Sequence, residues 1–138
     1  MIFEFQTGAY PDTAATMADH INGMAGRALL SAIREGLVAD GLSPTPIGAE
    51  DWGWYTDVEA DMHYMIGAIV YQDDAYTAGS NAPLDCLVQV WRTEPRTLLG
   101  FIPSKREVHA PLDDPLVGQI EAVIRSLEAV GDIQRSST

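Results

Sequence analysis

Four side chains that can bind a divalent cation stand two positions apart in the middle of the chain. They are Asp57, Glu59, Asp61 and His63. On one continuous β-strand all four would project from the same face, where carboxylate and imidazole ligands can hold a metal ion. Residues 58–61 also fit a polar hairpin turn, and the segment matches neither a calcium-loop nor a zinc-site pattern. These residues are therefore weak metal candidates, and we expect neither a bound metal nor a cofactor.

A second cluster combines acids with aromatic side chains. In a strand, Trp52 and Trp54 would share one face and Tyr55 would take the other. Either the indoles complete the core beneath a helix, or an exposed aromatic rimmed by carboxylates anchors a protein partner. The second interpretation predicts a partner-binding surface made of Glu50, Asp51, Trp52, Trp54, Tyr55, Asp73 and Asp74.

No catalytic residue is predicted. Cys86 lies in an apolar, strand-like segment, where a thiol behaves as a small hydrophobe. The serines lack a Gly-x-Ser-x-Gly pattern, and the three histidines are isolated from one another in sequence. The adjacent acids Asp113 and Asp114 have a sufficient structural role as a helix cap. These features favour a non-enzymatic protein.

The acidic charge is concentrated in the middle of the chain. The net charge is −12, and residues 35–91 hold ten acids without one Lys or Arg. Such a one-sign field favours a basic or partly apolar protein surface as partner, and it disfavours nucleic acid and anionic membrane. We expect the basic residues that follow to pair with this acidic segment; they are Arg92, Arg96, Lys105 and Arg106.

Length and composition indicate one domain. The chain has 138 residues, of which 46% are hydrophobic and 20% charged, as is ordinary for a globular protein with its own core. One cysteine excludes an internal disulfide and suits a reducing compartment. Neither a signal peptide nor an apolar run of membrane-spanning length is visible. We therefore expect a cytoplasmic protein, a monomer or dimer, with a single domain over 1–131 and a flexible tail over 132–138.

Apolar periodicity predicts a long helix near the start of the chain. Residues 1–6 alternate as a strand, and an apolar stripe of helical spacing then runs over residues 13–40. Gly23 and Gly26 weaken the helix interior, so this stretch forms either one long helix or two joined near 23–26. Asp113 or Asp114 caps a last helix that begins at Pro115 and ends at Gly131.

Between the two helical regions the period becomes that of strands. The predicted strands cover residues 45–49, 52–58, 62–72, 84–92 and, as a further candidate, 97–102. Turn residues fill 73–83. The order β-α-β-β-β-β-α predicts an α+β fold, in which an antiparallel meander of about five strands carries one long N-terminal helix across it and a C-terminal helix. This element order resembles that of bacterial secretion chaperones and cystatin-type folds, a likeness of fold alone.

Three functional hypotheses follow. The favoured one is a small acidic non-enzymatic module that binds a basic or partly apolar protein: an inhibitor of the immunity or antitoxin type, or a dedicated chaperone. The first alternative is a small-molecule or metal-dependent enzyme with a site between helix and sheet. The second is an acidic structural or stress domain without a specific ligand, which predicts evenly spread charges and no exposed aromatic side chain.

Overall fold

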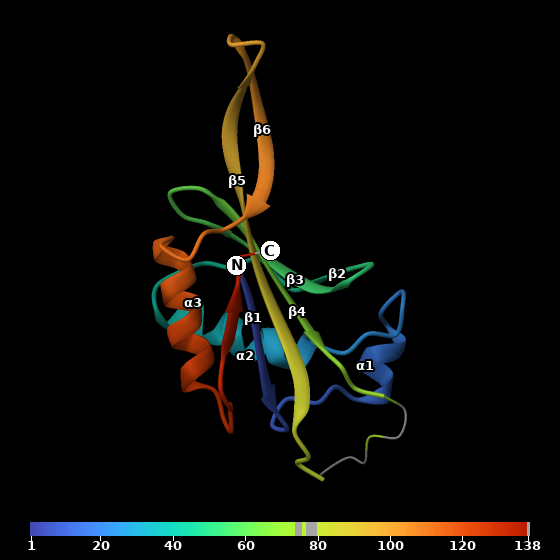
Figure 1. Cartoon of the computed structure of the whole chain (residues 1–138). Coiled ribbons are helices and arrows are strands. Elements are labelled where there is room, and N and C mark those ends of the chain that lie inside the picture. The colour runs from blue at the N-terminus through green and yellow to red at the C-terminus, as the bar shows by residue number, and fades with distance from the viewer. Residues whose placement is uncertain (74–75, 77–79, 138) are drawn as a thin grey trace.

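One antiparallel sheet organises the protein (Figure 1). The structure is a computed structural model, which describes residues 1–73, 76 and 80–137. In chain order the elements are β1 (Ile2–Thr7), α1 (Ala14–Ala18), α2 (Arg27–Ala39), β2 (Gly48–Glu50), β3 (Gly53–Glu59), β4 (His63–Val70), β5 (Leu84–Leu98), β6 (Ile102–His109), α3 (Pro115–Ser126) and β7 (Gln134–Ser136). Within the described residues, no helix is of the length and apolarity that crossing a membrane requires.

The coarse fold prediction is confirmed, and its strand count is corrected. The fold is α+β, with seven antiparallel strands rather than about five. The order is β2-β3-β4-β5-β1-β7, and β6 pairs with the outer part of β5. The additional strands are β6, which begins at the end of the candidate strand 97–102, and β7, which lies within the predicted flexible tail. Neither buries an apolar face, so neither shows the alternation that reveals a strand in sequence.

The predicted long N-terminal helix is corrected to two helices, α1 and α2. Gly23 and Gly26 have φ values of 67° and 143°, which a right-handed helix does not allow. A side chain at Gly26 would also lie 2.6 Å from the carbonyl oxygen of Ala68. Asp12, which precedes α1 in the chain, caps the start of α2. Its carboxylate accepts from the amides of Gly26, Arg27 and Ala28 at 2.8–2.9 Å.

The core lies between the sheet and helices α2 and α3. On β1, β3 and the first part of β5, alternate residues face the helices and are buried, as Phe3 and Phe5 are on β1. Leu29 and Ile33 of α2 and Ile120 of α3 fill the space against them. Among the residues that the structure describes, no helix covers the opposite face of the sheet, and α2 passes behind the strands in Figure 1.

Strand β5 belongs to two pairings on the same edge. Residues 84–89 pair with β1, and residues 91–98 pair with β6. The change occurs at Val90, whose carbonyl oxygen accepts from the Met1 amino group at 3.1 Å and from the Ala110 amide at 2.9 Å. Burial lowers the pKa of that amino group to about 6, against the opposing effect of the Asp114 carboxylate. Beyond this junction the β5–β6 hairpin leaves the body of the molecule (Figure 1).

Candidate functional site

The outer part of the β5–β6 hairpin is the candidate site, and residues 95–106 are called the arm. Its register pairs Pro95 with Lys105 and Leu98 with Ile102. Pro95 and Lys105 line a small hollow beside the β3–β4 turn, and the remainder projects away from the body (Figure 1). A two-stranded ribbon of this kind is only marginally stable by itself in water. None of the buried core residues lies in the arm, so packing of the core does not explain its sequence.

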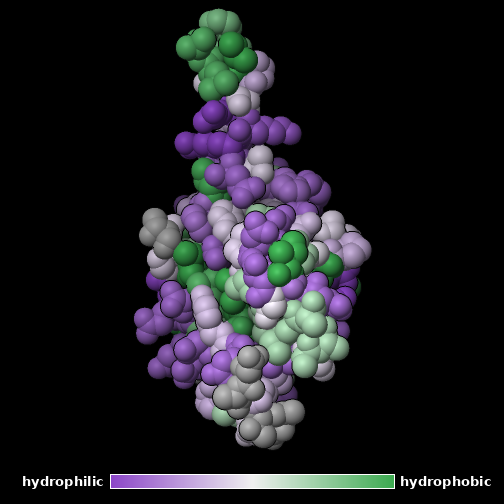
Figure 2. Space-filling model, turned by 90° about the vertical axis from the view of Figure 1, so that its right-hand side faces the viewer, coloured by the Kyte–Doolittle hydropathy of each residue, from purple (hydrophilic) through white to green (hydrophobic). Residues whose placement is uncertain are grey.

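Four large apolar side chains occupy the end of the arm, where a turn would ordinarily be polar. Leu98, Leu99, Phe101 and Ile102 are 39%, 82%, 75% and 41% exposed. Figure 2 shows them as a hydrophobic cluster at the extremity, separated from the body by a hydrophilic stem. We call these four residues the tip. A contiguous exposed apolar patch at the end of a projection is typical of an interaction site.

The backbone of the turn adds a second observation. Leu99 and Gly100 have φ values of 53° and 79°, and the Phe101 amide donates to the Leu98 carbonyl at 3.1 Å. Asn-Gly is the preferred pair where both central residues need positive φ. A leucine there costs about 1–2 kcal/mol. The tip therefore holds an exposed leucine in a backbone conformation that asparagine would adopt at lower cost. Strained backbone of this kind is often found at binding sites.

The arm is basic although the protein is acidic. Residues 95–106 contain Arg96, Lys105 and Arg106 and no acid, so the arm carries +3 and the rest of the chain −15 of the net −12. Arg106 lies 3.7 Å from Glu94. The sequence predicts that the basic cluster pairs with the acidic segment 35–91. The ion pairs of Arg92 and Arg106 instead go to Glu94 and Asp114, which lie outside that segment.

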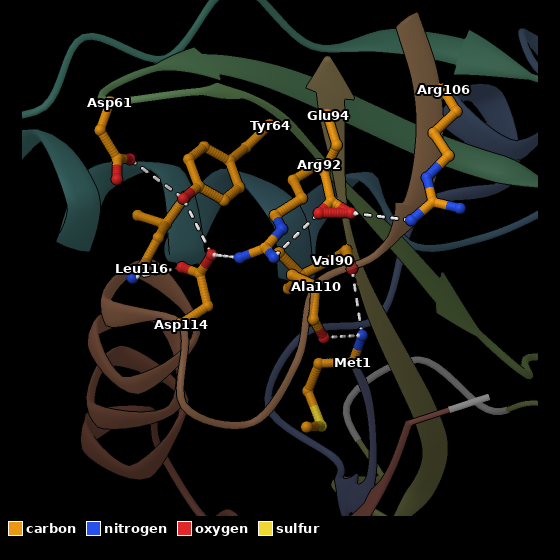
Figure 3. Close-up of polar contacts among 10 residues, drawn as sticks. All are labelled: Met1, Asp61, Tyr64, Val90, Arg92, Glu94, Arg106, Ala110, Asp114 and Leu116. Atoms are coloured by element: carbon orange, nitrogen blue, oxygen red, sulfur yellow. Dashed lines mark hydrogen bonds and ion pairs between the residues drawn. The ribbon is translucent and has the colours of Figure 1, made fainter. Parts of the chain in front are cut away.

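A polar network fixes the root of the arm to the body (Figure 3). Arg92 donates to Asp114 at 2.8 Å and to Glu94 at 3.1 Å. The side chain of Asp114 is 1% exposed, and it also caps α3 by accepting from the Leu116 amide at 2.8 Å. Arg92 thus ties the strand that enters the arm to the start of α3.

Two titratable groups in this network have displaced pKa values. Burial would raise the pKa of Asp114, but hydrogen bonds from Arg92, Tyr64 and the Leu116 amide outweigh it, and the pKa lies below its usual value. Burial and then the bond to Asp114 raise the pKa of Tyr64. Its hydroxyl lies 2.9 Å from Asp114 and 3.1 Å from Asp61, so its one proton is shared between the two carboxylates and the phenol stays protonated.

The weak metal candidates divide between two places. His63 contacts Glu59 and lies 3.4 Å from Asp57 on the helix-free face. The hydrogen bond to Glu59 raises the pKa of His63, against a smaller effect of burial. Asp61 instead turns to Tyr64 in the network at the arm root. Within the described part of the chain, no group of three or more potential ligands has metal-binding geometry.

The predicted aromatic surface is also divided. Trp54 lies in the core, 4% exposed, and its Nε1 donates to the Met24 carbonyl at 2.9 Å. Trp52 lies half-buried on the helix-free face, 5.0 Å from Trp91, and Tyr55 is half-buried as well. The acids Glu50, Asp51 and Asp73 are exposed, while Asp74 lies outside the described residues. Trp54 lies in the core, apart from the exposed acids, and the partner-binding role of the seven residues stays a prediction.

A groove of about 720 Å³ lies at the end of β5 opposite the arm. Its acidic lining residues are Glu4, Asp85 and Asp132, and its apolar ones include Tyr71 and Leu87. Cys86 contributes to the wall as a buried thiol, and burial raises its pKa to about 11. Such a thiol is protonated at neutral pH and is not a nucleophile.

The sequence contained a signal for the tip that pattern analysis missed. Leu98-Leu99-Gly100-Phe101-Ile102 is an apolar run around a turn glycine, framed by Pro95 and Pro103 and by basic residues. The prediction of one short strand over residues 97–102 concealed the turn within this run.

Comparisons of this chain with protein-family models, with curated proteins and with solved structures found no match.

Proposed function

We propose that this chain is a non-enzymatic binding module that contacts a partly apolar protein partner through the tip of its arm. The observation that carries the proposal is the set of four exposed apolar side chains at the end of a projecting hairpin. Because the arm is also basic, we expect the partner to offer an apolar pocket with an acidic rim. An inhibitor or a dedicated chaperone would use such an element.

The distribution of charge and aromatic residues supports this proposal over a domain whose acidity serves solubility alone. The charges are segregated, with +3 on the arm and −15 elsewhere, and Phe101 is 75% exposed. A domain whose acidity serves solubility alone does not require segregated charges. An exposed apolar patch would even reduce its solubility, because such patches promote aggregation.

The first prediction concerns the tip. Leu99→Asn combined with Phe101→Ser should remove partner capture in a pull-down from host lysate, because both changes delete apolar contact area. The melting temperature should stay the same or rise, since asparagine suits the positive φ at residue 99.

A matched control is Leu112→Ser, which removes an exposed leucine of the loop before α3. This variant should capture the partner as the unchanged protein does. Equal capture by the tip variant and the control would contradict the proposed function.

A further inference from the structure

The acidic groove and the tip lie at opposite ends of one strand. Asp85 and Leu87 of β5 line the groove, and Leu98 of the same strand begins the tip. At about 3.3 Å per residue, the 13 positions from 85 to 98 span about 40 Å. An arm therefore cannot reach the groove of its own chain, and any contact between them joins two molecules.

Groove and arm are complementary in chemistry. The groove presents the carboxylates of Glu4, Asp85 and Asp132 beside apolar surface from Tyr71 and Leu87, and no Lys or Arg is among its lining residues. The arm presents its apolar tip above three basic residues, with no acid between 95 and 106. Opposite charges around an apolar centre are the arrangement that specific protein interfaces use.

The groove opens on the helix-free face of the sheet. Glu4 and Asp85 are exposed, whereas their strand neighbours Phe5 and Cys86 are buried beneath the helices, so the acids point away from the core. The same face carries the half-buried Trp52 and Trp91. Two sheets can stack through such faces about 10 Å apart.

We propose that the groove receives the arm of a second copy of this chain, and that two copies exchange arms reciprocally into a closed dimer. The inference rests on the proposed function, because it takes the arm to be a protein-binding element and names the protein that it binds. Each copy supplies one arm and one groove, so a two-fold axis closes the pair. At physiological ionic strength screening acts over about 8 Å, which weakens the repulsion between the acidic bodies more than the attraction between charges in contact.

Paired charge reversals test the exchange. Arg96→Glu with Lys105→Glu makes the arm acidic, and Glu4→Lys with Asp132→Lys makes the groove basic. By light scattering, the unchanged protein should have twice the 15.0 kDa chain mass, and each variant alone should have the mass of one chain. An equimolar mixture of the two variants should regain the mass of two chains, because both contacts in the mixed pair again join opposite charges.

A control variant makes the same charge change elsewhere. Asp19→Lys with Asp40→Lys alters two exposed acids outside the groove and should remain a dimer. Rescue in the mixture also shows that both arm and groove variants are folded, because unfolded chains would not recover a defined mass.

Several outcomes would overturn the proposal. They are an unchanged protein that stays monomeric at high concentration, a mixture that does not regain the mass of two chains, and masses beyond two chains, which indicate open head-to-tail assembly. A monomer that floats with phosphatidylserine vesicles through Leu99 and Phe101 would assign the arm to a membrane surface instead. A monomer that captures a different protein through the tip would overturn the dimer and leave the proposed function standing.

Discussion

At the scale of single residues, Asp114 connects three elements. Its carboxylate binds Arg92 at the root of the arm, the hydroxyl of Tyr64 on β4 and the first turn of α3. A buried carboxylate is costly unless its partners satisfy it. Here they do, and a charge that is almost wholly withdrawn from water joins the root of the arm to the body.

Asp114→Asn should lower the free energy of unfolding by about 3 kcal/mol at pH 7, because it leaves the Arg92 charge without its buried partner. Asparagine still caps a helix, so the loss reports the ion pair. The pKa of Asp114 is lowered in the folded protein. Its stabilisation is therefore present above the unfolded value of about 3.9 and is lost as the pH falls through the lower folded value.

Urea unfolding at about pH 7 and at a pH below the folded pKa of Asp114 measures this difference. The deficit of the variant should shrink at the acid pH, and a deficit of equal size at both would refute the assignment. Asp113→Asn is the matched control, because Asp113 is the exposed neighbour in the chain.

At the scale of elements, two glycines divide the apolar stripe over residues 13–40 into α1 and α2. Gly26 requires a positive φ and also lies against the backbone of β4, whereas Gly23 has open space around it. The two positions therefore separate the cost of backbone conformation from the cost of a steric clash.

Gly26→Ala should cost about 3 kcal/mol or more, because it adds a clash with Ala68 to the conformational cost. Gly23→Ala should cost about 1 kcal/mol, from conformation alone. Thermal unfolding of both variants measures the difference. Were the stretch one continuous helix, both changes would stabilise the protein by up to about 1 kcal/mol, and that result would contradict the two-helix structure.

What the sequence could predict follows from which residues face the core. β1, β3, β4 and a cap at Asp113 or Asp114 were predictable, because burial or capping chemistry dictates their residues. The outer half of β5 and its partner β6 bury no apolar face, so no alternation of apolar residues marks them as strands. The candidate site lies in that part, and the pairing of distant segments that creates its root network has no local signature.

At the scale of the whole molecule, the arm stands apart from the core of the body. The core consists of residues from the sheet and the helices, and none of the buried core residues lies in the arm. The root network reaches Glu94, which precedes the arm, and Arg106, which is the last residue of the arm.

Replacing residues 95–105 by Asn-Gly should leave the body folded. Glu94 and Arg106 would then flank a two-residue hairpin turn, and the net charge would change from −12 to −14 with the loss of Arg96 and Lys105. The melting temperature should shift by no more than about 4 °C, as circular dichroism can measure, and tip-dependent binding should be lost. Unfolding of the shortened chain would show that the arm is part of the folding unit.

The place of β1 in the sheet has a consequence for how the chain is made. β1 pairs with β5 and β7, and Gln6 stands 79 positions before its partner Asp85. During synthesis the side chains of Phe3 and Phe5 therefore leave the ribosome long before the strands that will pair with β1. Until then this strand has unpaired edges and an apolar face open to other chains, and its closure is a late, non-local step.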